Sequence, residues 1–126
     1  MALIGTWDDV MGSAPNDIQA IANALRSAIK SGHADVFEEA RIGDKAVSYG
    51  WGPKKMLEGY AYLMPQKDRV NLGFYYGAHL DDPSGLLEGT GKSLRHVKVR
   101  AADVTADISA LITAAREERR TELGIE

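Results

Sequence analysis

The sequence predicts an α+β fold, in which a mainly antiparallel sheet of four or more strands packs its helices on one face. Two observations predict the class: apolar residues recur at helical spacing in residues 13–30 and 102–120, whereas residues 45–77 hold aromatic and β-branched runs broken by turn residues. The length of 126 residues allows one hydrophobic core, so we expect a single domain over residues 1–126. Its core should occupy about residues 15–120.

Residues 13–30 predict the first helix, with Ser13 as its N-cap and Gly32 just beyond its end. One stripe of the helix is apolar and comprises Ile18, Ile21, Ala22, Leu25, Ala28 and Ile29. A shorter helix is expected over residues 34–40, where apolar and acidic side chains would occupy opposite faces.

Three strands are expected next, in the runs KAVSYGW, GYAYLM and RVNLGFYYG. Residues such as Pro53 and Pro65 mark the turns between them. Alternation in the third run predicts one face toward the core, made of Val70, Leu72, Phe74 and Tyr76.

Residues 89–93, GTGKS, look like the end of a phosphate-binding loop. Such a loop needs a glycine five positions before its Gly-Lys pair, and Leu86 stands there instead. The following run is of β type, although a phosphate-binding loop requires a helix at that point. A nucleotide site of this kind is therefore not expected.

The same stretch predicts two structural features. Asp82 and Pro83 should begin a single helical turn, and a glycine loop with at least one positive φ should follow it. Residues 93–100, SLRHVKVR, then predict a fourth strand whose valines face the core. The last helix is expected over residues 102–120, capped by Asp103 or Thr105. Its apolar side comprises Ile108, Leu111, Ile112 and Ala115.

Composition narrows the classes of function. The formal charge of −3 argues against a nucleic-acid binder, which needs Lys and Arg to neutralise phosphates. The absence of cysteine excludes disulfides and thiolate sites and is typical of a reducing compartment. There is no apolar run near the roughly 20 residues that cross a bilayer, and the N-terminus lacks a signal-peptide pattern. We therefore expect a cytoplasmic protein without nucleic-acid or membrane partners.

Basic residues around the glycine loop are the candidate ligand-binding site: Lys92, Arg95, His96, Lys98 and Arg100. Such a cluster suits a small anionic ligand or an acidic protein surface. The alternative is a solvated strand face whose charges discourage edge pairing. The first hypothesis is accordingly a binding or interaction module without a cofactor, and a homodimer is left open. The histidines and serines form no nucleophile-and-base motif, so catalysis is not expected.

The acidic residues Asp35, Glu38 and Glu39 are candidates for a metal site, because their spacing would place them on one face of the expected short helix. Oxygen ligands of this kind suit hard cations, and His33 could add a nitrogen. The alternative is that they cover the solvated side of the helix. Aromatic residues of the predicted strands are expected mostly in the core, with some lining a binding groove.

The string GYAYLMPQKDRVNLGFYYGAHLDDPSGLLEGTGKSLRHVKVR resembles the YdhG-like family of small bacterial domains of unknown function. The resemblance extends over about residues 15–120 and is most specific over 70–100. It implies a compact α+β domain. Some relatives are described as frataxin-like intracellular iron chaperones, which makes iron binding the alternative function. Residues 13–30 contain one acid, Asp17, whereas frataxins have a densely acidic first helix.

Overall fold

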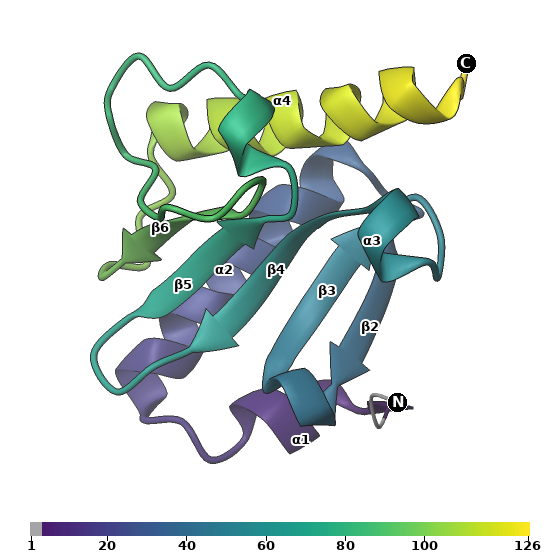
Figure 1. The fold of residues 1–126 in the computed structure, drawn as a ribbon. Coiled ribbons are helices and arrows are strands. Elements are labelled where there is room, and N and C mark those ends of the chain that lie inside the picture. Colours follow the sequence, from purple (N-terminus) through teal and green to yellow (C-terminus); the bar gives the residue numbers. More distant parts are fainter. Residues whose placement is uncertain (1–3) are drawn as a thin grey trace.

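The structure is a computed structural model that describes residues 4–126 and contains a six-stranded sheet. The strands are β1 (Ile4–Gly5), β2 (Phe37–Arg41), β3 (Ala46–Gly50), β4 (Gly59–Pro65), β5 (Val70–Phe74) and β6 (Arg95–Val99). They lie side by side in chain order, and every neighbouring pair is antiparallel (Figure 1). The predicted α+β class with a mainly antiparallel sheet is confirmed.

Two long helices and several short ones accompany the sheet. The α-helices are α1 (Trp7–Met11), α2 (Asn16–Gly32), α3 (Lys55–Glu58) and α4 (Ala106–Leu123). Two single 3-10 turns are η1 (Ile42–Asp44) and η2 (Gly77–His79). In the view of Figure 1, α2 lies behind the sheet and α4 runs along its upper end.

One face of the sheet forms the main core with α2 and α4. The register pairs Val47 with Leu63, Leu63 with Leu72, and Leu72 with Val97, so a row of buried aliphatic side chains crosses four strands. The predicted apolar stripes of α2 and α4 pack against this row. Each fully buried aliphatic side chain contributes about 1.5–3 kcal/mol.

The boundaries of the long helices follow capping chemistry. Thr105, one of the two caps that the sequence allowed, accepts a hydrogen bond from the Ile108 amide at the start of α4. Gly124 ends the helix in the left-handed region with φ of 69°. For α2 the N-cap is Pro15, not Ser13, and the helix includes Gly32.

The helix predicted over residues 34–40 is wrong, because this segment contains β2. Glu38 pairs with Tyr49 and Ala40 with Val47, so these two side chains face the core side, while Phe37, Glu39 and Arg41 face the other side. The alternation was hidden because a glutamate occupies an inward position. That glutamate is neutralised there by Arg26.

Two smaller predictions also need correction. No helical turn forms after Asp82; its carboxylate instead accepts hydrogen bonds from the Leu86 and Leu87 amides and holds a turn. Tyr76 lies beyond the end of β5 and does not face the core with Phe74. The glycine loop is confirmed, since Gly89 has φ of 125°.

Candidate functional site

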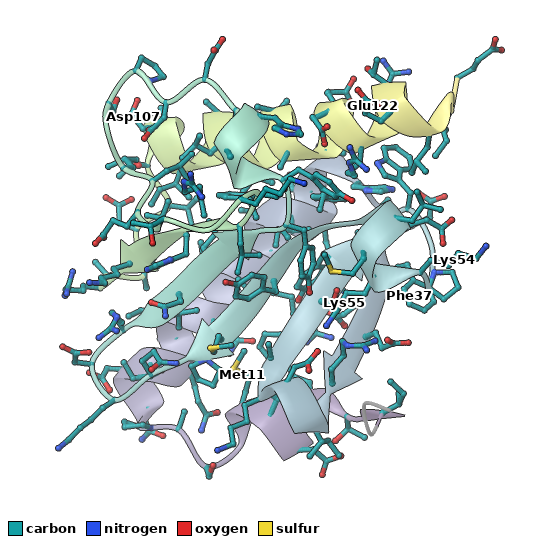
Figure 2. The ribbon with its side chains drawn as sticks, in the orientation of Figure 1. Met11, Phe37, Lys54, Lys55, Asp107 and Glu122 are labelled. Atoms are coloured by element: carbon teal, nitrogen blue, oxygen red, sulfur yellow. The ribbon has the colours of Figure 1, made fainter. Side chains whose placement is uncertain are left out.

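A cavity of about 560 Å³ lies against the face of the sheet that α2 does not cover, here called the open face. Its lining comprises Asp44, Ala46, Lys55, Met56, Tyr62, Met64, Tyr75, Lys92, Ser93 and Leu94. The floor comes from β3, β4 and Tyr75, the residue after β5, and the walls come from η1, α3 and the loop before β6. Figure 2 shows Lys55 on the side of the sheet that faces the viewer, opposite α2. Most of the lining is apolar.

Strand alternation builds the floor of the cavity. When Val47, Leu63 and Leu72 face the core, their neighbours Ala46, Tyr62 and Gly73 must face the open side. The Tyr62 ring lies directly on Gly73, where a Cβ atom would be 1.8 Å from the ring. Only glycine at this position leaves room for the tyrosine.

Tyr75 completes the floor and fixes the ring of Tyr62. The centroids of these two rings lie 5.3 Å apart, and the Tyr75 hydroxyl donates to Ser48 Oγ at 3.1 Å. Burial raises the pKa of Tyr75 to about 12, so its phenol is neutral at physiological pH. The floor is therefore an ordered aromatic surface.

The wall formed by α3 is held by side chains from outside it. The Tyr76 hydroxyl donates to the Met56 carbonyl, and Arg119 donates to the Leu57 carbonyl at 3.2 Å. Arg119 also lies 3.5 Å above the Tyr76 ring and forms a two-point ion pair with Glu118. These contacts fix the position of the wall relative to α4.

The charges around the cavity are unevenly balanced. Asp44 accepts hydrogen bonds from Arg41 at 2.9 Å and from Lys55 at 3.0 Å, and these two cations lower its pKa. By contrast, no carboxylate in residues 4–126 lies within 4.0 Å of the Lys92 ammonium. The loop before β6 thus supplies a positive charge that no described residue neutralises by an ion pair.

The structure disperses the predicted basic set. Lys92 alone lines the cavity, while Lys98 lies 3.3 Å from Glu88. Arg95 donates to the carbonyls of Gly91 and Leu94, and its backbone pairs with Phe74, so it belongs to the core-side register. His96 shares the open face with Lys98 but lies outside the cavity lining. Arg100 follows β6 and is exposed.

The structure also separates the predicted acidic set. Glu38 and Glu39 point to opposite faces of β2, and each pairs with an arginine. Asp35 lies in the turn after α2 with a fully solvated side chain, 3.7 Å from His33. Across residues 4–126, no group of three or more His, Asp or Glu side chains is arranged to hold a metal ion.

Most residues of the cavity are absent from the sequence-based candidates. Asp44, Ala46, Met56 and Met64 belong to separate segments that only the sheet register brings together. One feature of the sequence could have indicated this site. The outward-facing strand positions Ala46, Tyr62 and Met64, which alternate with core residues, are not charged. Outward positions that are apolar indicate a covered or ligand-binding face.

Comparisons of the chain with protein-family models, with curated proteins and with solved structures found no match. Within residues 4–126, no helix has the length and apolar character needed to cross a bilayer.

Proposed function

We propose that this protein is a binding module that holds a small amphipathic anion in the open-face cavity. The observation that carries the proposal is a mainly apolar cavity of about 560 Å³ whose lining includes Lys92, a lysine without an ion-pair partner among residues 4–126. Ligand sites are usually concavities of roughly 300–1,000 Å³ with mainly apolar walls and a few polar groups. The size and the lining both support a small molecule as the occupant.

The charge distribution supports an anion. Asp44 is already neutralised by Arg41 and Lys55, so that part of the rim offers little net charge to a ligand. Lys92 has no such partner among the described residues and can pair with a ligand oxygen. The apolar part of the ligand would then lie on Ala46, Met64 and the tyrosine rings.

The alternative of iron binding has less support. The three predicted carboxylates share no site, and two of them are neutralised by arginines. The iron hypothesis and the resemblance to the YdhG-like family therefore stay predictions.

A titration with 8-anilinonaphthalene-1-sulfonate tests the proposal, because this fluorophore joins an aromatic body to one negative charge. We expect saturable fluorescence with the folded wild type. Lys92→Ala should weaken binding by about fivefold, since a partly exposed ion pair contributes up to roughly 1 kcal/mol. Ala46→Leu should reduce binding further, because it places three carbon atoms on the floor of the cavity.

Lys67→Ala is the matched control, because Lys67 is an exposed lysine in the turn between β4 and β5, outside the cavity lining. Its affinity should equal that of the wild type. Equal affinities for Lys92→Ala, Ala46→Leu and the control would contradict the proposal. Thermal unfolding of each variant checks that the fluorophore reports the folded protein.

A further inference from the structure

The Tyr62 hydroxyl differs from the other tyrosine hydroxyls of the protein. Tyr49, Tyr60, Tyr75 and Tyr76 each form a hydrogen bond to another residue. Tyr62 is only 9% exposed, yet its hydroxyl has no hydrogen-bond partner within residues 4–126. A phenol without a protein partner has its hydrogen-bonding capacity free for water or a ligand.

The Tyr62 hydroxyl is accessible to solvent, and its side chain lines the cavity. Every fully buried side-chain nitrogen or oxygen in residues 4–126 has a partner, so the Tyr62 oxygen must lie in accessible space. Tyr62 lines the open-face cavity, and its ring packs against Gly73. The position of the hydroxyl is thus fixed by packing before any ligand arrives, which reduces the entropy lost on binding.

The protonation state of the Tyr62 phenol determines which ligand groups it can bind. Burial raises the pKa of Tyr62, so the hydroxyl stays protonated and can donate a hydrogen bond at neutral pH. Hydrogen bonds to a charged acceptor are roughly twice as strong as those between neutral groups. An anionic oxygen is therefore a better acceptor here than an alcohol.

On the basis of the proposed function, we propose that Tyr62 and Lys92 together select an amphipathic monocarboxylate, an aliphatic or aromatic carboxylic acid whose apolar part fills the cavity. One ammonium group compensates one negative charge. Among residues 4–126, no arginine lines the cavity, and its other lysine, Lys55, is already paired with Asp44, so no further cation is free for a second negative charge. Phosphate monoesters, whose sites gather arginines or several backbone amides, match this lining less well.

Calorimetry with three eight-carbon probes tests the ligand class on the wild-type chain. Octanoate, octanol and octylamine share the apolar tail and differ in the head group. We expect octanoate to bind at least tenfold more tightly than octanol, and octylamine to bind most weakly because of Lys92. Octanol binding as tightly as octanoate, or no heat from octanoate, would overturn the inference even where the fluorophore binds.

Tyr62→Phe removes only the hydroxyl and leaves the ring on Gly73. It should weaken the binding of octanoate by about tenfold and change the affinity for octanol by less than threefold. Tyr60→Phe is the matched control, because Tyr60 is a buried tyrosine that bonds His33 outside the cavity. Unchanged octanoate affinity in Tyr62→Phe, with unfolding as in the wild type, rejects the role of the hydroxyl. Failure of fluorophore binding in the wild type rejects the proposed function itself.

Discussion

Gly73 shows how one small residue determines the shape of the candidate site. Its Cα hydrogens lie under the Tyr62 ring, where a methyl group would come within 2.0 Å of two ring carbons. The sequence pattern VNLGFYY predicted the strand but gave no reason for its glycine. The reason is a cross-strand contact between β4 and β5, which depends on the register.

Gly73→Ala should therefore destabilise the protein by about 1–3 kcal/mol, because the ring has to leave its place. Urea unfolding followed by circular dichroism measures the change. Gly91→Ala is the control: an added Cβ there meets no atom within 4 Å, and we expect a change below about 0.5 kcal/mol. Equal stability of the two variants would show that the contact between the Tyr62 ring and Gly73 tolerates a methyl group.

At the scale of elements, hydrophobic periodicity was sufficient for the two long helices and for the strands of the middle region. These elements bury an uninterrupted apolar stripe or face, so the period is visible in the sequence. It failed for β2, where Glu38 occupies an inward position. A charged residue can occupy such a position only with partners, and Arg26 comes from α2, twelve residues earlier. A contact of this kind is not visible in local periodicity.

The ion pair between Arg26 of α2 and Glu38 of β2 should stabilise the fold. Glu38→Gln keeps the shape of the side chain but removes the charge that Arg26, Lys30 and the Tyr49 hydroxyl contact. The group is partly solvated, so we expect a loss of about 1–2 kcal/mol in unfolding free energy, less than for a fully buried pair.

Asp68→Asn is the comparison for this variant, because its ion pair with Arg69 involves a carboxylate that is 64% exposed. Chemical denaturation of both variants should show a change of at most about 0.5 kcal/mol for Asp68→Asn. A Glu38→Gln protein as stable as the wild type would mean that solvent replaces the partners of this carboxylate.

At the scale of the whole molecule, the candidate site was the part that was hardest to predict from the sequence. Its lining extends from residue 44 to residue 94 and comes from six separate elements and loops. Of the predicted ligand-binding residues, only Lys92 lies in it. Proximity in the sequence suggested a basic cluster, but alternation along β6 and local pairing with Glu88 separate its members.

For the whole molecule, we expect His33 to account for much of the stability that is lost at acid pH. Its ring is buried at the end of α2, contacts the Tyr60 hydroxyl at 2.9 Å and lies 4.1 Å from the Trp51 ring. Burial lowers its pKa, and Arg116 lowers it further, against the opposing effects of Asp35 and Glu117. The histidine is therefore neutral in the folded protein at pH 7.

The lowered pKa of His33 makes the folded protein less stable as the pH falls. As the pH falls below about 6.5, the unfolded chain protonates His33 before the folded protein does, so the free energy of unfolding decreases until the folded pKa is passed. Urea midpoints at pH 7.5 and 5.0 should fall more for the wild type than for His33→Asn. His96→Asn, a change at a strand surface, should retain the wild-type decrease. Parallel decreases in all three proteins would assign acid sensitivity to other groups.

The order of the strands has a consequence for how this site can change. Because each strand lies beside its neighbour in the chain, η1, α3 and the loop of residues 77–94 all lie in connections between strands that are already adjacent. Lengthening such a connection costs little, about 0.6 kcal/mol for each doubling of a flexible loop. It also leaves every pairing partner in the sheet the same. The walls of the cavity can thus be exchanged while the aromatic floor is kept, which makes this sheet a scaffold on which the shape of the candidate site is separable from folding.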